Sequence, residues 1–231
     1  MRFDYIIVGA GSAGCVVANR LCSKDNKVLL IEAGPENSGI SLKMPAAVLQ
    51  NLKSTKYNWA YKGEPEIELN GRQIQHDRGR TLGGSSSING MVFIRGHALD
   101  YDGWRQAGCE GWSYSDVLPY FKKMENYSGG GDKFRGGSGP LNIQRPNPDN
   151  PLVLKFIEAG KEAGYPITND INGFCQEGFG LLDSSVFKGE RSSTAKAYLG
   201  PIKNCSNLSV ATSAQVERVI VENGIAKGVI Y

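Results

Sequence analysis

The chain has 231 residues, of which 40% are hydrophobic and 21% charged, and its formal net charge is +3. This composition is typical of a globular protein with enough length to bury a core in one large domain or two modest ones. No Lys/Arg cluster is interleaved with aromatic residues, so nucleic acid binding is not indicated. No apolar run reaches the roughly eighteen residues that a transmembrane helix needs.

The five cysteines are scattered and odd in number: Cys15, Cys22, Cys109, Cys175 and Cys205. Because no pair has metal-ligand spacing, we predict neither a zinc site nor a disulfide framework. Cys15 and Cys22 fall in the first predicted helix, where small buried thiols are expected. Free thiols suit a reducing compartment. A strand that begins by residue 5 leaves no room for a signal peptide, and a cytoplasmic location is therefore expected.

The first predicted elements are a short buried strand over Tyr5–Val8, a glycine-rich turn, and an apolar helix that runs to Leu21. A second strand follows over 27–31 and ends at Glu32. The turn reads Gly9-Ala10-Gly11-Ser12-Ala13-Gly14. Strand, G-x-G-x-x-G, helix, strand and acid are the parts of a dinucleotide-binding α/β unit, and here they stand in order.

Each glycine of this turn has a predicted task. Gly9 permits the tight turn, Gly11 lets the backbone approach a pyrophosphate, and Gly14 lets the helix pack on the strand. The unpaired N–H groups of the helix N-terminus attract phosphate. Glu32 can accept hydrogen bonds from a ribose diol, which favours NAD or FAD over NADP. A turn shaped only by packing is the alternative.

Further along the chain, apolar residues over 42–52 have helical spacing, 58–61 looks extended, and 73–76 forms a possible short strand. A second glycine-rich turn covers 79–90. Its composition alone would allow a flexible linker. The apolar continuation over 91–94 favours an ordered, buried passage into a strand instead.

The rest of the chain alternates helices and strands. A helix over 116–124 is capped by Ser115, and a helix over 151–163 is closed by Gly164. A short helix covers 193–199. Strands are predicted over 208–211, 215–222 and 225–230, with Asn223-Gly224 as a tight hairpin turn.

With both glycine turns placed, the sequence resembles the glucose–methanol–choline (GMC) oxidoreductases, especially the choline-dehydrogenase-like branch. The most specific match is GRTLGGSSSINGMVFIRGHALDYD over 79–102. Further matches are DYIIVGAGSAG, EAGP, NWAYKGEP, GWSYSDVLPYFKKMEN, GERSSTAKAYL and LSVATSAQVERVIVENGIAKGV.

The resemblance implies a Rossmann-like FAD-binding fold of GMC type, a mixed α/β fold with added antiparallel strands that is truncated at the C-terminus. Residues 1–231 would be the N-terminal FAD-binding region, with 40–80 and 100–190 as insertions or a cap. The C-terminal substrate and catalytic region would be absent.

The resemblance implies FAD as the cofactor and assigns its contacts by position. Pyrophosphate contacts are expected at Gly9, Gly11, Ser12, Ala13 and Gly14, adenosine contacts at Glu32, Ala33 and Val216, and further contacts at Trp59 and Arg80. Leu82, Gly83, Gly84 and Ser85 would run beside the ribityl and diphosphate, and Asn89, Gly90, Met91 and Val92 along the flavin ring. Some family members attach the flavin through a histidine where this chain has Ile88, so non-covalent FAD is expected.

The implied reaction oxidises a primary alcohol, choline-like or other, to an aldehyde by hydride transfer to flavin N5. Oxygen or a quinone-type carrier would accept the electrons. The family's catalytic histidine lies near the C-terminus, and neither His76 nor His97 matches it. No catalytic residue and no metal site are therefore predicted here, and the isolated chain is expected to be inactive.

Two alternatives remain at this point. The chain can be a non-catalytic FAD-binding or interaction fragment that needs a complementing C-terminal polypeptide. An NAD-dependent dehydrogenase is the other alternative, but it leaves 79–102 without a role. The sequence leaves open which alcohol is the substrate, whether the enzyme is an oxidase or a dehydrogenase, and the oligomeric state.

Overall fold

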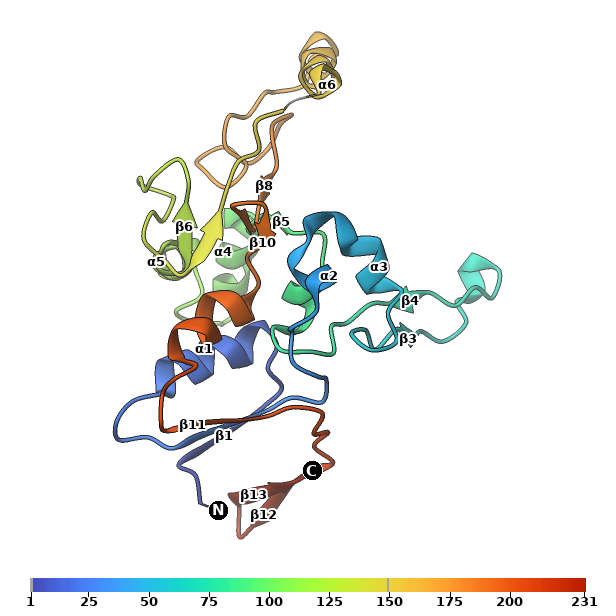
Figure 1. Cartoon of the computed structure of the whole chain (residues 1–231). Helices are drawn as coiled ribbons and strands as arrows, with labels where there is room; N and C mark the ends of the chain where they lie inside the picture. Colours follow the sequence, from blue (N-terminus) through green and yellow to red (C-terminus); the bar gives the residue numbers. More distant parts are fainter. Residues whose placement is uncertain (1, 149) are drawn as a thin grey trace. The chain divides into compact units, whose positions relative to one another are not determined.

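The computed structural model describes residues 2–148 and 150–231 and divides the chain into two compact units. The first unit comprises Met1–Gly90 and Gly189–Tyr231, and the second comprises Met91–Lys188. The chain is coloured from its N-terminus to its C-terminus in Figure 1. Each unit is described by itself.

The first unit is built on a parallel sheet of three strands, β1 (Tyr5–Val8), β2 (Val28–Ile31) and β11 (Leu208–Ala211). β2 lies in the middle, and all four of its residues are buried. Helix α1 (Ser12–Leu21) packs on one face of the sheet (Figure 1) and buries Cys15 and Ala18. The predicted strand–helix–strand start of a Rossmann-like fold is thus confirmed.

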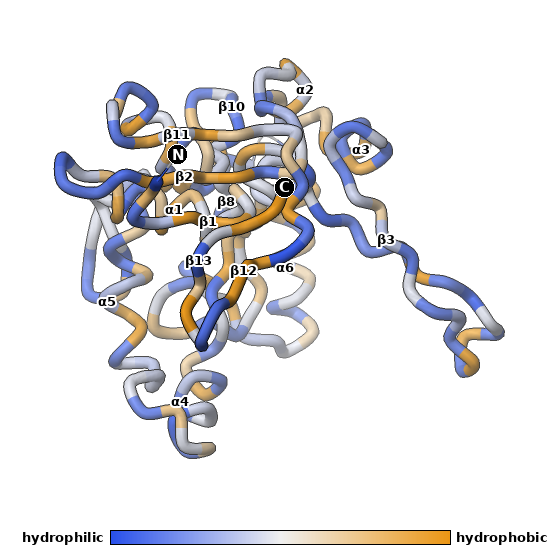
Figure 2. The backbone as a smooth tube through the Cα atoms, turned by 90° about the horizontal axis from the view of Figure 1, so that it is seen from below, coloured by the Kyte–Doolittle hydropathy of each residue, from blue (hydrophilic) through white to orange (hydrophobic). Residues whose placement is uncertain are grey.

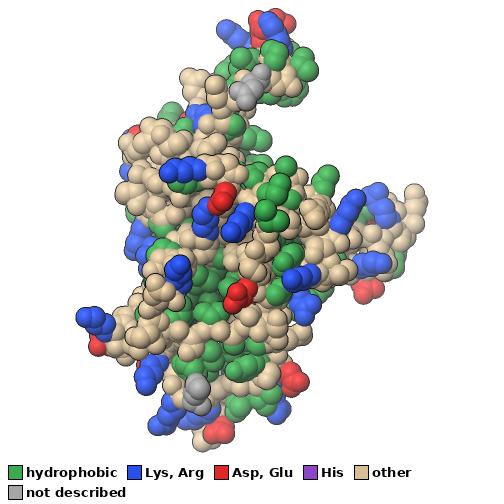
Figure 3. Space-filling model, in the orientation of Figure 1, with side chains coloured by type: hydrophobic (Ala, Val, Ile, Leu, Met, Phe, Trp, Pro, Cys, Tyr) green, Lys and Arg blue, Asp and Glu red, His purple; other side chains and the backbone are tan. Residues whose placement is uncertain are grey.

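A hairpin of β12 (Arg218–Glu222) and β13 (Ile225–Ile230) stands beside the other face of the sheet. Asn223 and Gly224 both have positive φ, 50° and 75°, as a two-residue type I′ turn requires. Figure 2 shows hydrophobic stretches of this hairpin next to β1, and hydrophobic side chains gather over sheet and hairpin in the lower part of Figure 3. The predicted hairpin is confirmed.

The helix predicted over 42–52 is interrupted. It divides into α2 (Ile40–Lys43), a 3₁₀ turn (Pro45–Ala47) and α3 (Val48–Leu52). Pro45 disfavours helical backbone at Met44, which is extended with φ −78° and ψ 119°. The proline therefore ends one helix and begins the next turn.

The remaining elements of the first unit are short. They are β3 (Tyr61–Lys62), β4 (Gln75–His76) and β10 (Glu190–Arg191), 3₁₀ turns over Ile67–Leu69, Gly84–Ser87 and Gly200–Ile202, and a π-helical turn over Ala195–Leu199. β3 and β4 pair in antiparallel orientation.

The second unit combines three helices with five short strands among its described residues. They are β5 (Val92–Phe93), α4 (Ala98–Gln106), α5 (Tyr114–Met124), β6 (Glu125–Tyr127), β7 (Leu141–Ile143), α6 (Pro151–Glu162), β8 (Asp183–Ser184) and β9 (Val186–Phe187). β5 pairs with β8 in antiparallel orientation, and β6 pairs with β7 in parallel orientation.

Two sequence predictions for this unit need correction, and one helix was not predicted. The passage over 91–94 is not buried throughout, because Val92 and Ile94 are 54% and 59% exposed. Helix α4 was not predicted; it begins with a capping box between His97 and Asp100. The cap of α5 is Ser113, whose hydroxyl accepts the N–H of Asp116 at 3.3 Å. Ser115 lies inside the helix.

The cysteines also differ from the prediction, because Cys22 and Cys205 form a disulfide. It joins the C-terminal end of α1 to the segment that precedes β11, across 183 residues of sequence. Cys15 is a small buried thiol as predicted, and burial raises its pKa to about 11, so the thiol stays protonated. Within residues 2–148 and 150–231, no helix is long and apolar enough to cross a bilayer.

Candidate functional site

A cavity of about 390 Å³ opens in the first unit where β1 and β2 end at the first glycine turn. Residues from five stretches of the unit line it: Val8, Gly9, Gly11, Ile31, Glu32, Ala33, Trp59, Tyr61, Gly79, Gly84, Ala214, Gln215 and Val216. Ligands of open α/β sheets bind at the carboxyl ends of the strands, which is where this cavity lies.

Gly9 and Gly11 of the first glycine turn line the cavity at the N-terminus of α1. Gly9 has φ +90°, and a Cβ at Gly14 would overlap the carbonyl oxygen of Gly9. A Cβ at Gly11 would meet no atom within 4 Å. The N–H groups of Ser12 and Ala13 have no acceptor within the helix, because they belong to its first turn. The turn therefore offers backbone donors and open space to an anion.

The second glycine turn packs directly on the first. The N–H of Gly83 donates to the carbonyl oxygen of Ala10 at 2.7 Å, and a Cβ at Gly84 would lie 2.7 Å from the Cα of Gly11. Gly83 and Gly84 have φ of +90° and +53°, which favours glycine. The turn is ordered, so the flexible-linker interpretation is wrong.

Glu32 follows β2 and ties the first glycine turn to the loop after that strand. One carboxylate oxygen accepts the N–H of Ala10 at 2.8 Å, and the other accepts that of Gly34 at 2.9 Å. The side chain is 6% exposed and lines the cavity. Each oxygen keeps a second lone pair, so the carboxylate can still accept from a hydroxyl. Its contact with a ribose stays a prediction.

Two aromatic side chains, Trp59 and Tyr61, line part of the cavity. The rings of Trp59 and Tyr61 stack with centroids 5.6 Å apart, and the guanidinium of Arg80 lies 4.8 Å from the Trp59 centroid. Sequence reasoning missed Tyr61. The stretch over 58–61 was predicted as extended, but Ala60 has φ +48°, so simple alternation along a strand does not predict that Tyr61 faces the cavity.

The cavity brings together seven of the predicted cofactor residues, namely Gly9, Gly11, Glu32, Ala33, Trp59, Gly84 and Val216. Eleven others do not line it: Ser12, Ala13, Gly14, Arg80, Leu82, Gly83, Ser85, Asn89, Gly90, Met91 and Val92. Most of these belong to the two glycine turns. Met91 and Val92 belong to the second unit, where the carbonyl oxygen of Met91 accepts the N–H of Ser185 at 2.8 Å.

A dinucleotide with a pyrophosphate fits this arrangement. The space beside Gly11 is open, the helix N-terminus supplies donors, and a second glycine turn lies against the first without any intervening side chain. Both histidines lie among the described residues, and neither lines the cavity. The Nδ1 of His97 accepts the N–H of Leu99 at 3.2 Å at the start of α4.

Comparison with known proteins gives a consistent result. The family model described as GMC oxidoreductase matches residues 3–231. The oxygen-dependent choline dehydrogenase of Rhizobium etli is 49% identical over 231 residues, which are 99% of this chain and 42% of that protein. The mitochondrial choline dehydrogenase of Mus musculus is 47% identical over 238 residues, with 100% of this chain and 40% of that protein covered.

Solved structures show the same fold. Pyridoxine 4-oxidase from Mesorbium loti superposes with a TM-score of 0.93 at 34% identity, covering 99% of this chain and 45% of that one. An FAD-dependent oxidoreductase from Chaetomium thermophilum gives 0.90 at 30% identity, covering 99% and 41%. The chain thus spans about two fifths of the length of the curated relatives it matches.

Proposed function

Because the chain belongs to the GMC oxidoreductase family, whose members depend on FAD, we propose that it forms the FAD-binding part of an enzyme that oxidises a primary alcohol to an aldehyde. The observation that carries this proposal is the packing of two glycine turns against each other beside the N-terminus of α1. The substrate is choline-like or another alcohol, and oxygen or a quinone-type carrier accepts the electrons.

The residues of this chain bind and orient the cofactor. The first-turn amides of α1 hold the pyrophosphate beside Gly11. Glu32 and Ala33 receive the adenosine ribose, and the backbone at Val216 receives the adenine. When bound, FAD supplies the hydride-accepting chemistry of the family. With Ile88 before Asn89, no side chain at that position attaches the flavin, so binding is non-covalent.

We assign no catalytic residue to this chain. Neither His76 nor His97 lines the cavity, although both are described by the structure. The proton-accepting group of the complete enzyme is assigned to sequence outside these 231 residues. Turnover would then require that remaining sequence, and a complementing C-terminal polypeptide is one way to supply it. This proposal rests on the coverage of about two fifths of the relatives.

Calorimetric titration with three nucleotides tests the proposed binding mode. FAD is expected to bind about a hundred-fold or more tightly than FMN, because FMN lacks the adenosine and the second phosphate that the cavity is proposed to hold. ADP, which carries both, is expected to compete with FAD. Equal affinity for FAD and FMN, or no competition by ADP, would contradict the assignment of this cavity.

A further inference from the structure

The segment over 189–199, which reads GERSSTAKAYL, has no role in the binding mode described above. Its Arg191 is 2% exposed and reaches the second glycine turn within the same unit. Nη1 donates to the carbonyl oxygen of Asn89 at 2.7 Å and to its Oδ1 at 2.8 Å. The same nitrogen lies 3.3 Å from the carbonyl oxygen of Ser86.

The Nε atom of Arg191 makes a further contact, on the side of the guanidinium away from Asn89. Nε donates to the carbonyl oxygen of Leu42 at 3.2 Å, at the end of α2. Nη2 is buried and has no hydrogen-bond partner among the described residues. Arg191 therefore links α2 to the C-terminal end of the second glycine turn.

The charge of Arg191 has no carboxylate partner within the part of the chain that the structure describes. Burial lowers the pKa of its guanidinium, and no nearby acid opposes this effect. A buried cation without a counter-charge costs stability, and so does a buried donor without an acceptor. A methionine of similar length would fill the space without these costs. The contacts of Arg191 thus suit a task other than stabilising the core.

A second set of hydrogen bonds joins the segment over 189–199 to the second glycine turn. The hydroxyls of Ser86 and Thr194 lie 2.9 Å apart, and the N–H of Thr194 donates to the Ser86 Oγ at 3.0 Å. Ser86 Oγ donates in turn to the carbonyl oxygen of Gly83 at 2.6 Å. The turn is held at Gly83 through these hydroxyls and at Asn89 through Arg191.

We propose that Arg191 is a positioning residue of the candidate FAD site, which holds residues 86–89 in the conformation that receives the cofactor. The inference rests on the proposed function, since 89–92 is assigned to the flavin ring. Arg191 acts through the carbonyl groups that it binds. It also brings an uncompensated positive charge to the segment assigned to the flavin.

Hydrogen exchange measured by mass spectrometry on the full 231-residue chain without FAD tests the positioning role. The N–H groups of Gly83, Ser86 and Asn89 are hydrogen-bonded, so their exchange reports on the turn. Arg191→Met is expected to speed exchange over 83–89 by about ten-fold or more, because charged hydrogen bonds are lost. Arg191→Lys, which keeps the charge and one donor group, is expected to restore part of the protection.

Lys196→Met is the matched control, because Lys196 belongs to the same segment but forms an exposed ion pair with Glu190. It is expected to leave exchange over 83–89 unchanged. Unchanged exchange in Arg191→Met would overturn the proposal. If Arg191→Met fails to fold, Arg191→Lys decides: faster exchange confined to 83–89 supports the proposal, and a uniform increase or none overturns it.

Titration of the same variants with FAD separates this inference from the proposed function. Arg191→Met is expected to bind FAD about ten-fold or more weakly than the wild-type chain, with Lys196→Met unchanged. If the wild-type chain does not bind FAD, the proposed function fails for this chain. The hydrogen-exchange experiment then still decides whether Arg191 holds the second glycine turn. If FAD binding is unaffected in Arg191→Met, the positioning role is wrong.

Discussion

Replacing Gly11 with valine is expected to weaken FAD binding by at least about a hundred-fold, or about 2.8 kcal/mol, while thermal unfolding stays close to that of the wild type. The added side chain would meet no protein atom near its Cβ, and Gly11 has φ −72°, which valine adopts without strain. The side chain would instead occupy the space assigned to the pyrophosphate. Fluorescence titration with FAD and a melting curve measure the two effects.

Gly14→Val is the matched control for this change. A Cβ at Gly14 would overlap the carbonyl oxygen of Gly9 and lie 3.4 Å from Ile7 Cγ2. This substitution is expected to lower the free energy of unfolding by about 1–3 kcal/mol, as overpacking does. If Gly11→Val retained FAD at wild-type affinity, the first glycine turn could not be the pyrophosphate site.

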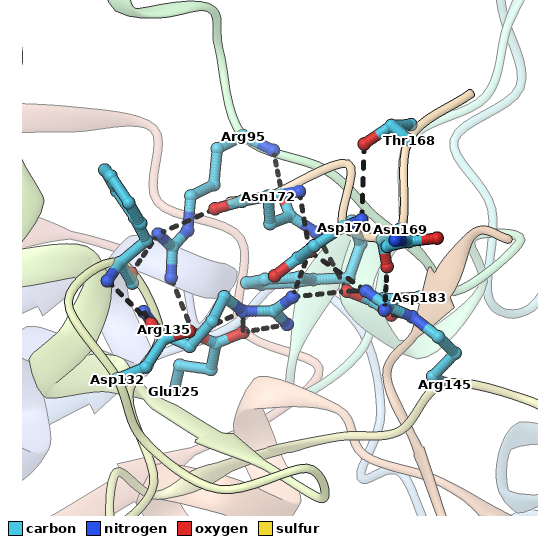
Figure 4. A network of polar contacts seen from close by, with 12 residues as sticks. Arg95, Glu125, Asp132, Arg135, Arg145, Thr168, Asn169, Asp170, Asn172 and Asp183 are labelled. Atoms are coloured by element: carbon cyan, nitrogen blue, oxygen red, sulfur yellow. Dashed lines mark hydrogen bonds and ion pairs between the residues drawn. The ribbon is translucent and has the colours of Figure 1, made fainter. Parts of the chain in front are cut away.

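The second large effect is expected from Glu125, the centre of a buried ionic network in the second unit. Figure 4 shows the network. Glu125 accepts from Arg95 Nη2 at 2.6 Å and from Arg135 Nη2 at 2.6 Å, and all three side chains are at most 2% exposed. Arg135 Nη1 also contacts Asp183 at 2.8 Å, and Asp183 contacts Arg145 Nε at 2.9 Å.

Glu125→Gln is expected to lower the free energy of unfolding by about 3–5 kcal/mol, because two buried guanidinium groups lose their shared carboxylate. Urea unfolding measures the loss. Glu158→Gln is the control, since the Lys155–Glu158 pair is exposed, and it is expected to cause little change. A Glu125→Gln chain as stable as the wild type would show that the network does not stabilise the unit.

The same network is expected to weaken in acid. Burial alone raises the pKa of Asp183, but hydrogen bonds from Arg145 and Asn172 and the charge of Arg135 outweigh it, so the pKa is lowered from 3.8. A carboxyl whose pKa is lower in the folded state than in the unfolded state stabilises the fold at every pH above its unfolded-state pKa. This stabilisation is lost as the pH falls from the unfolded-state pKa through the folded-state pKa. The stability difference between wild type and Asp183→Asn should therefore shrink below about pH 4. A constant difference from pH 7 to pH 3 would refute this account.

The local parts of the fold were predictable from sequence. The first 32 residues contain all the motifs that predict the strand–helix–strand unit, and Asn223-Gly224 alone predicts the hairpin turn. Both predictions succeed because turn chemistry and strand pattern act over short distances in the sequence. Helix α4 was missed because aromatic residues and Gly103 obscure its periodicity, and its start signal at His97 and Asp100 is an unusual cap. Apolar composition also suggested burial for Val92, which the fold leaves half exposed.

Long-range features were not predictable. The disulfide joins cysteines 183 residues apart, and spacing alone cannot pair them. Glu125 and Asp183 are charged, which normally indicates the surface, and only the tertiary fold brings Arg135 between them. Tyr61 was missed among the cavity residues for a different reason, since no glycine marks the left-handed backbone of Ala60 that precedes it. Arg191 is separated from Asn89 by 102 residues, so its contacts depend on the packing of the unit.

The measurement that tests the central claim most directly is an absorption spectrum of the purified chain, taken after incubation with FAD and gel filtration. We predict a yellow protein whose twin flavin bands co-elute with the chain and pass into the supernatant on acid precipitation. A colourless protein that leaves all FAD in the small-molecule fractions would contradict the claim that these residues build an FAD site. Flavin that stays with the acid precipitate would contradict non-covalent binding.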